Sequence, residues 1–326
     1  MPRILVRHLA KTYRIARRGR GAAGAVTGLF RREYRELRAL KDLSFEVGEG
    51  EILGYIGPNG AGKSTTIKIL SGIMRPDSGE CLVSGRVPWA DRVAHVRRIG
   101  VVFGQRSQLW WDLPTIESFR LLKTMYGVPE AEYRRNLGEL DALLSLDALL
   151  DVPVRQLSLG QRMRCELAAS LLHGPEVLFL DEPTIGLDAA AKIAMRGFIR
   201  RYNRERGLTV LLTTHDMDDI EELSHRIIVL HEGEAVYEGD TEGLRRRAGS
   251  ARRLVVDTEG RAPVAPVPGA EMREDEGRIT WLYDPGRVPV EAIIASVTAS
   301  RRIVDLSSEA EPIESVVARV YRERGA

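Results

Sequence analysis

Short apolar runs bounded by turn residues alternate along the chain with longer segments of helical periodicity. The clearest apolar runs are residues 51–56, 99–103, 177–180 and 210–213. They lack the strict alternation of a half-exposed strand, so we expect buried strands in a largely parallel sheet with both faces covered. The order of these strands and the intervening helices predicts an α/β fold.

Two further segments, residues 4–13 and 39–47, are typical of outer antiparallel strands. An insertion is expected between them at about residues 14–37, because that stretch opens as a Gly-, Ala- and Arg-rich loop without a core pattern. Nine basic residues against two acidic ones between positions 11 and 38 give this region a local charge of +7. The insertion either binds an anionic membrane surface, binds nucleic acid, or forms a solvated loop.

A helical subdomain is predicted over about residues 106–172, because the pattern from 114 to 150 is helical without a strand. Residues 227–230 and 235–237 predict a hairpin that closes the first domain at residue 240. Beyond it, strands are expected at 253–257, at 279–283 and near 303–306, with amphipathic helices starting near 290 and 313. Residues 241–326 are therefore expected to form a small accessory α+β domain, whose helix faces fit its own core or a dimer contact equally well.

The chain has 326 residues, 44% of them apolar and 29% charged, which suits two folded domains and excludes a disordered chain. Forty-eight basic residues against 46 acidic ones leave a net charge of +2, so no nucleic-acid partner is expected. Two cysteines exclude a disulfide scaffold and suit a reducing compartment. No apolar stretch approaches the roughly 18 residues that span a bilayer, and the start lacks a signal peptide, so we expect a cytoplasmic protein.

Residues 57–64, GPNGAGKS, fit the P-loop (Walker A) pattern G-x-x-x-x-G-K-[ST] between an apolar strand and a helix. Glycines let the backbone turn its N–H groups around phosphate oxygens, and the following helix presents its positive end. Lys63 would neutralise the β- and γ-phosphates, and Ser64 would ligate Mg²⁺. The alternative is a glycine-rich turn that carries a surface lysine.

Residues 177–182, VLFLDE, supply the second half of such a site. Asp181, at the carboxyl end of the strand, can hold the Mg²⁺ shell where ligands collect in open α/β sheets. Glu182 is then placed to orient and polarise the attacking water. Alone, an acidic pair after a strand is usually a helix cap, and the P-loop is what favours the catalytic interpretation.

Residues 157–161, LSLGQ, precede a helical run and lie about twenty positions before Asp181. They resemble the L-S-G-G-Q signature of ATP-binding cassette (ABC) ATPases, with Leu159 in place of the first glycine. Ser158 and Gly160 can still offer hydroxyl and N–H donors to a γ-phosphate. The resemblance covers about residues 3–240 and identifies the chain as a member of the ABC ATPases, which implies the P-loop NTPase fold of that family with antiparallel outer strands and a helical subdomain.

The resemblance also gives roles to isolated residues at the expected spacing. Gln105 matches the glutamine that touches Mg²⁺ and water, His215 the switch histidine, and Asp188 the aspartate of the D-loop at the subunit contact. Tyr13 matches the aromatic residue that stacks on adenine, and its alternative is an exposed strand tyrosine. A lone His or Gln at a strand end is more often a satisfied loop residue, so these assignments depend on order and spacing together.

The resemblance implies ATP and Mg²⁺ as cofactors. Catalysis is expected from Glu182, His215 and Gln105, and metal binding from Ser64, Gln105 and Asp181. The residues expected to bind nucleotide are Tyr13, Gly57, Pro58, Asn59, Gly60, Ala61, Gly62, Lys63, Ser64, Thr65, Ser158, Gly160, Gln161 and Asp188. In this family the signature of one subunit closes over ATP held by the P-loop of another, so one P-loop and one signature imply a homodimer.

Residues 102–114, VFGQRSQLWWDLP, look like a bacterial subfamily of ABC-2 type exporter ATPases related to drug and viologen exporters. Residues 311–317 resemble the final helix of the accessory domain in drug-exporter ATPases. The resemblance implies ABC-2 type transmembrane permease partners and a peripheral position on the inner face of the cell membrane. Trp110 and Trp111 lie where the family contacts its membrane subunits, or else they are buried in the helical subdomain.

Two other functions stay open from the residues alone. One is a soluble non-transport ABC ATPase that acts on nucleic acid or ribosomes, although the chain carries one cassette and no room for a long coiled coil between P-loop and signature. The other is a nucleotide-binding regulatory protein, which the pairing of Glu182 with His215 disfavours. The transported substrate is not encoded in any motif of this chain.

Overall fold

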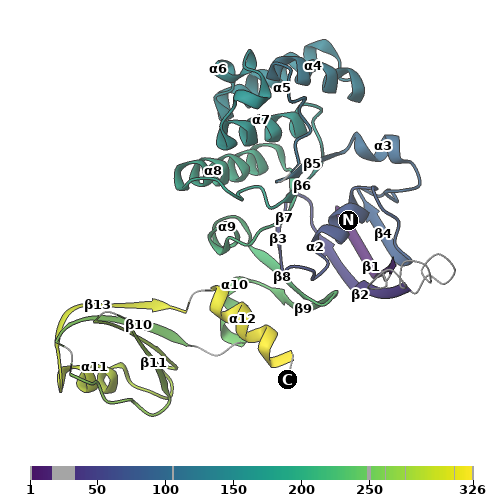
Figure 1. The fold of residues 1–326 in the computed structure, drawn as a ribbon. Helices are drawn as coiled ribbons and strands as arrows, with labels where there is room; N and C mark the ends of the chain where they lie inside the picture. The colour runs from purple at the N-terminus through teal and green to yellow at the C-terminus, as the bar shows by residue number, and fades with distance from the viewer. Residues whose placement is uncertain are drawn as a thin grey trace, which may run out of the picture. The chain divides into compact units, whose positions relative to one another are not determined.

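A computed structural model describes residues 2–16, 34–104, 106–247, 251–260, 262–275, 277–311 and 313–324. The chain divides into two compact units, Met1–Glu238 and Gly239–Ala326, which are described separately (Figure 1). Among the described residues, no helix combines the length and apolar character needed to cross a membrane.

A six-stranded sheet forms the centre of the first unit, in the order β5-β6-β7-β3-β8-β9. Its strands are β3 (Ile52–Ile56), β5 (Ile99–Phe103), β6 (Val177–Asp181), β7 (Thr209–Thr213), β8 (Arg226–His231) and β9 (Glu234–Gly239). Neighbours from β5 to β8 pair in parallel. This confirms the predicted α/β fold with a parallel sheet.

Both faces of the sheet are covered, as the continuous apolar runs predict. On β6, Leu178 and Leu180 belong to an apolar cluster shared with the helices of residues 115–202. Val177 and Phe179, which point the opposite way, belong to a cluster shared with an antiparallel sheet. Period-two alternation therefore divides each central strand between two cores.

The antiparallel sheet has the order β2-β1-β4, with β1 at Ile4–Ala16, β2 at Tyr34–Val47 and β4 at Ser78–Val83. The expectation that the insertion begins at 14 and ends at 37 is wrong at both edges, because residues 14–16 pair with residues 34–36. Backbone pairing extends this ribbon although Ile15, Tyr34 and Leu37 are exposed. The remainder of the predicted insertion, residues 17–33, lies outside the described residues.

Helices surround these sheets. They are α2 (Lys63–Leu70), α3 (Arg92–Val96), α4 (Thr115–Tyr126), α5 (Glu130–Leu144), α6 (Asp147–Leu150), the 3₁₀ turn η1 (Val154–Gln156), α7 (Leu159–Leu171), α8 (Ala189–Arg206) and α9 (Met217–Leu223). Helix α2 contacts β2, β4 and β6, so it lies between the two sheets. The described part of residues 114–150 is helical apart from short turns, as predicted.

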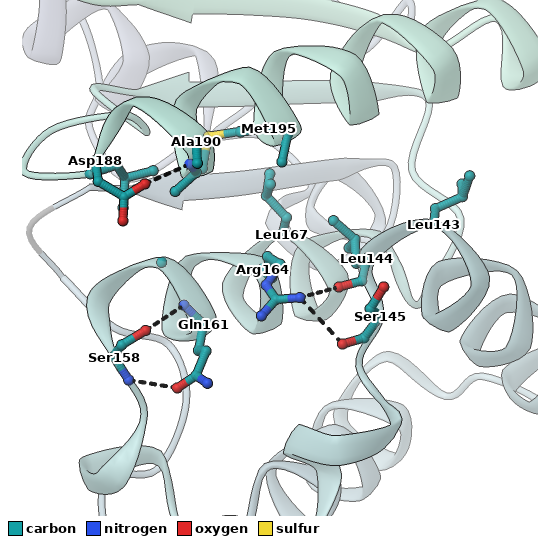
Figure 2. A pocket seen from close by; sticks show the side chains of 14 residues that line it. Leu143, Leu144, Ser145, Ser158, Gln161, Arg164, Leu167, Asp188, Ala190 and Met195 are labelled. Carbon is teal, nitrogen blue, oxygen red and sulfur yellow. Dashed lines mark hydrogen bonds between the residues drawn. The ribbon is translucent and has the colours of Figure 1, made fainter.

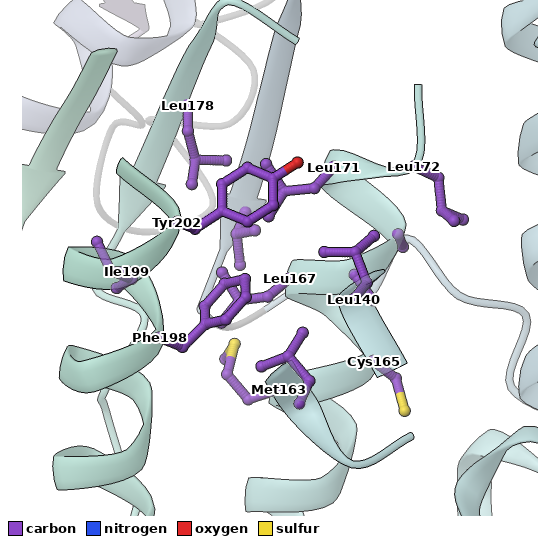
Figure 3. Packing of buried hydrophobic residues seen from close by; sticks show 14 of the residues in the cluster. Leu140, Met163, Cys165, Leu167, Leu171, Leu172, Leu178, Phe198, Ile199 and Tyr202 are labelled. Carbon is purple, nitrogen blue, oxygen red and sulfur yellow. The ribbon is translucent and has the colours of Figure 1, made fainter. Parts of the chain in front are cut away.

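Helix α7 is the buried centre of the helical region. Figure 3 shows its residues Met163, Leu167 and Leu171 facing Phe198 and Tyr202 of α8. The two aromatic rings lie 5.6 Å apart between centroids in a tilted arrangement. Cys165 is buried in this cluster, and both Cys81 and Cys165 are free thiols, as the cysteine count predicts. Burial raises the pKa of the Cys165 thiol to about 11.

The second unit is an α+β structure around a four-stranded antiparallel sheet of order β11-β12-β10-β13. Its elements are α10 (Thr241–Arg247), β10 (Arg252–Glu259), β11 (Ala270–Asp275), β12 (Arg278–Tyr283), α11 (Val290–Thr298), β13 (Arg302–Ala310) and α12 (Ile313–Arg324). Trp281, fully buried, packs in a cluster with Ile293 and Val297 of α11. The predicted strands and helices are confirmed, whereas α10 and the edge strand β11 were not predicted.

Candidate active site

The P-loop joins the fully buried strand β3 to helix α2. Gly60 and Gly62 have φ values of 85° and 110°, a region that favours glycine. A Cβ on Gly62 would lie 2.6 Å from the carbonyl oxygen of Ala39, so a side chain is excluded there. The Ala61 carbonyl accepts from the N–H of Gly233 in the β8–β9 turn at 3.0 Å. The loop is therefore held in shape by the chain around it.

Lys63, the first residue of α2, is 6% exposed. Its ammonium donates to the carbonyl oxygen of Gly57 at 2.6 Å and to that of Pro58 at 3.2 Å. Burial lowers the pKa of Lys63, and the carboxylates of Glu182 and Asp181 oppose that shift. These carboxylates thus act on the lysine from the end of β6, which is separated from β3 by β7 in the sheet.

Asp181 ends β6 in the position that the sequence predicts. Its Oδ1 accepts a hydrogen bond from the Thr213 hydroxyl at 2.6 Å. A cavity of about 370 Å³ lies beside Asp181. Four of the predicted site residues are among those that line it: Asn59, Ser64, Asp181 and Glu182. Thr213 was not predicted as a site residue. A hydroxyl residue at the carboxyl end of a mostly apolar strand is a sequence pattern that could have indicated it.

Glu182 has a φ of 56°, which is unusual for a residue with a side chain. Such backbone conformations cost about 1–3 kcal/mol and concentrate at active sites. The carbonyl of Glu182 closely approaches Gly104, where an added Cβ would lie 2.1 Å from that oxygen. Its carboxylate Oε1 lies 2.6 Å from Nε2 of His215. Two of the three residues predicted for catalysis, Glu182 and His215, are therefore in direct contact.

Gln105, predicted for catalysis and metal binding, lies outside the described residues. The segment that follows it is fixed to the signature helix α7. Glu166, 4% exposed, accepts from the hydroxyl of Ser107 and from the N–H of Gln108. Burial raises the pKa of Glu166, and these hydrogen bonds oppose that shift.

Tyr13 lies beside the start of α2. Its hydroxyl is 3.3 Å from Oγ1 of Thr65 and 3.2 Å from the sulfur of Met74. Thr65 belongs to the predicted nucleotide-binding set, so the ring is near the P-loop helix and is only partly exposed. This position suits the base-stacking role that the sequence assigns to Tyr13.

Ser158 and Gln161 form a capping box at the start of α7. The Ser158 hydroxyl accepts from the backbone N–H of Gln161 at 3.2 Å, and the side-chain Oε1 of Gln161 accepts from the backbone N–H of Ser158 at 2.9 Å. Asp188 caps α8 by a single bond, in which its carboxylate accepts from the N–H of Ala191 at 2.8 Å. Ser158 and Asp188 are therefore both helix caps, and the cap at Ser158 fixes the helix N-terminus that Gly160 adjoins.

Figure 2 shows the cavity beside these caps, with Ser158 and Gln161 at the start of α7 and Asp188 at the start of α8. Its volume is about 430 Å³. Of the described residues, none lines both this cavity and the one at Asp181. Within one chain the P-loop and the signature thus lie at two different cavities, and the predicted nucleotide-binding set is not brought together.

The residues around Asp181 fit a magnesium ion bound together with a nucleotide. Mg²⁺ prefers oxygen ligands and is usually held by one or two carboxylates, hydroxyls and substrate phosphates. Ser64 and Asp181 offer a hydroxyl and a carboxylate to the same cavity. The described residues contain no group of three or more His, Cys, Asp or Glu placed to hold a metal, so a cage built from protein ligands alone is absent there.

Residues 40–185 match the family model of the ABC transporter. The chain is 36% identical over 267 residues to Nod factor export ATP-binding protein I of Paraburkholderia xenovorans, covering 80% of this chain and 86% of that protein. It is 33% identical over 230 residues to a linearmycin resistance ATP-binding protein of Bacillus subtilis, covering 71% and 73% of the two chains.

A solved structure shares this fold. It is a dimeric ATP-binding cassette in a post-hydrolysis state bound to ADP and Pi, with a TM-score of 0.61 and 27% identity over 73% of this chain and 98% of that one. Together with the P-loop, the contact between Glu182 and His215, and the signature helix, these likenesses confirm the predicted family. The chain belongs to the ATP-binding proteins of ABC transporters, and it is an ATPase.

Proposed function

We propose that two copies of this chain close over two ATP molecules, each bound between the P-loop of one copy and the signature of the other. The observation that carries this proposal is the separation of the two half-sites: Ser64 and Asp181 line one cavity, and Ser158 and Gly160 line another. Within a single chain, the P-loop half-site and the signature half-site therefore do not face each other. The similar cassette that is dimeric when bound to ADP and Pi supports a dimer of this chain.

In the proposed reaction, the N–H groups of the P-loop and the Lys63 ammonium bind the β- and γ-phosphates. Glu182 orients a water molecule and accepts its proton while the water oxygen bonds to the γ-phosphorus and the bond to the β-phosphate oxygen breaks, releasing ADP and phosphate. His215 holds the Glu182 carboxylate through their contact. Ser64 and Asp181, with Gln105 as the third ligand expected from the sequence, would hold Mg²⁺, which would neutralise charge on the phosphates.

A complementation experiment tests the composite site. Lys63→Ala disables the P-loop half by removing the cation that binds phosphate. Ser158→Asp disables the signature half, because aspartate keeps the helix cap but places a negative charge beside the phosphate. If sites are shared, each chain alone loses ATPase activity and an equimolar mixture regains part of it, since mixed dimers contain one intact site.

The control is Ser158→Thr, which keeps both the cap and the hydroxyl and should retain activity in the same assay. No gain on mixing, although pull-down of one tagged variant recovers the other with ATP, would contradict a site shared between chains. A trapped dimer is expected from Glu182→Gln with ATP, because binding is kept and turnover is blocked.

We further propose that the chain powers export through ABC-2 type permease subunits at the inner face of the cell membrane. The names of the two relatives, one for export and one for resistance, favour export over an action on nucleic acid or ribosomes. Trp110 and Trp111 are 39% and 53% exposed, so the alternative of fully buried tryptophans is excluded. Leu121 and Met125, one turn apart on α4, are also exposed.

These exposed apolar side chains support a permease contact at the segment between β5 and α4. Trp111 is held beside Arg162 of α7, whose guanidinium carbon lies 5.7 Å from the ring centroid. Trp110→Ala with Trp111→Ala should abolish co-purification with the permease while leaving ATP binding intact. Unchanged co-purification would refute this contact. Binding of the basic segment to anionic lipid stays a prediction, which flotation with and without anionic vesicles tests.

A further inference from the structure

A buried carboxylate lies behind the pair formed by Glu182 and His215. Asp219 of α9 has no exposed surface. Its Oδ2 accepts from the hydroxyl of Thr184 at 2.5 Å and from the hydroxyl of Thr214 at 3.0 Å. One carboxylate oxygen therefore joins two segments that are thirty residues apart in the sequence.

The two threonines that donate to Asp219 are close in sequence to two of the residues predicted for catalysis. Thr184 follows Glu182 by two residues, and Thr214 directly precedes His215. Both threonines are buried, and the Thr214 hydroxyl also accepts from the N–H of Asp216 at 2.9 Å. The backbones on either side of the reacting pair are thus fixed to the same atom.

Arg196 of α8 anchors the carboxylate from the other side. Its Nε donates to Oδ1 of Asp219 at 2.6 Å, and the guanidinium also donates to Glu222 at 2.8 Å and Asp216 at 3.3 Å. Arg196 is 5% exposed, so a charged pair is buried here with its hydrogen bonds satisfied. A charge-assisted bond of this kind restricts the carboxylate to one orientation.

We infer that Asp219 is a positioning residue for ATP hydrolysis. Through Thr184 and Thr214 it sets the separation of the Glu182 carboxylate and the His215 imidazole, and it holds Glu182 in a backbone conformation that ordinary residues avoid. Displacement of a reacting group by about 1 Å can cost about a hundredfold in rate. This inference rests on the proposed roles of Glu182 and His215.

The test replaces both hydroxyls by methyl groups of the same shape in the full chain. Thr184→Val with Thr214→Val should lower kcat by about tenfold or more and leave the KM for ATP within about twofold, because the phosphate-binding loop is unchanged. Thr184→Ser with Thr214→Ser restores the hydroxyls and should recover most of the lost kcat. Thr214→Val alone gives the same comparison should the double valine variant not fold.

A stability control separates positioning from general weakening. Ile199→Ala removes core packing from α8, and its side chain belongs to the apolar cluster rather than to the Asp219 bonds. The inference stands if the valine variant loses more kcat than Ile199→Ala at an equal fall in Tm and the serine variant recovers it. It is overturned by an unchanged kcat, by a raised KM at constant kcat, by a loss that serine does not recover, or by a loss matched by Ile199→Ala.

Glu182→Gln is assayed alongside. If it turns over ATP like the wild type, the proposed catalytic role of Glu182 fails, and the role inferred for Asp219 fails with it. If it is inactive while the valine variant has normal kcat, only the role of Asp219 is overturned.

Discussion

The Nε2 of His215 lies 2.6 Å from Oε1 of Glu182, although 32 positions separate them (215 − 182 − 1) and they end neighbouring segments of the sheet. Glu182 is the less exposed of the two side chains, with 22% of its surface accessible against 46% for His215. The carboxylate is thus the more enclosed of the two groups, and the imidazole is the more accessible one.

Glu182→Gln is expected to abolish turnover while ATP binding is kept. The amide has the same size but cannot accept the proton of the attacking water, so the steady-state rate should fall by about a hundredfold or more. Phosphate release gives the rate and fluorescence titration gives the affinity. Glu205→Gln, a surface change on α8 that breaks only the pair with Arg201, is the matched control. A normal rate in Glu182→Gln would rule out the assigned role.

Gly104→Ala should reduce kcat without weakening ATP binding. The new Cβ would lie 2.1 Å from the carbonyl oxygen of Glu182, so the backbone that carries the carboxylate must shift. A displacement of this size predicts a loss of about tenfold or more in kcat. Gly138→Ala in α5 is the control, because a Cβ there meets nothing within 4 Å. Equal kinetics in both variants would show that the close approach is not required.

Tyr13→Ala should weaken ATP binding, whereas Tyr13→Phe should not. A base stacked on an aromatic ring gains about 1–3 kcal/mol, so loss of the ring predicts at least about a fivefold rise in Kd. Phenylalanine keeps the ring and removes only the hydroxyl contacts with Thr65 and Met74. Inorganic tripolyphosphate, which has no base, should bind all three proteins alike. If Phe and Ala weaken ATP binding equally, the hydroxyl and not the ring is responsible.

Acidification should destabilise the first unit through His173. Burial lowers the pKa of this histidine from 6.5 to about 4, and its ring stacks on Tyr126 at 4.0 Å with Nε2 donating to the carbonyl of Ile99. The folded state therefore binds fewer protons than the unfolded state between these values. The stabilisation that comes from the neutral, buried His173 is complete above pH 6.5 and is lost as the pH falls toward 4.

The maximal slope expected from this histidine is about 1.4 kcal/mol per pH unit. Urea unfolding at several pH values measures it. His173→Gln keeps a donor for Ile99 and does not titrate, so that variant should lack this part of the slope. A slope identical to that of the wild type would exclude His173 as its source.

The central strands could be predicted from the sequence because they are buried on both faces and carry uninterrupted apolar runs, as residues 177–180 do. Strands β4 and β11 could not, because half or more of their side chains are exposed and backbone pairing holds them in place. Backbone pairing also extends β1 and β2 into the region that the sequence predicts to be a loop.

Much of the candidate site could also be predicted, since P-loop and acidic pair are local patterns. The positive φ of Glu182 and its contact with Gly104 could not, because both depend on chain segments brought together by the sheet. Spacing alone also gave no sign that Ser158 and Asp188 lie at a different cavity from Ser64. The role of Asp219 could not be predicted, because its sequence context does not distinguish this buried acidic residue from the exposed acidic residues beside it.

The left-handed backbone conformation of Glu182 creates a conflict between folding stability and ATP turnover at this position. Glycine would adopt that conformation without steric cost, so a search for heat-resistant variants that ignores activity would be drawn to replace this glutamate. Heat-resistant variants selected without an activity assay are therefore expected to lose the carboxylate to which we assign catalysis.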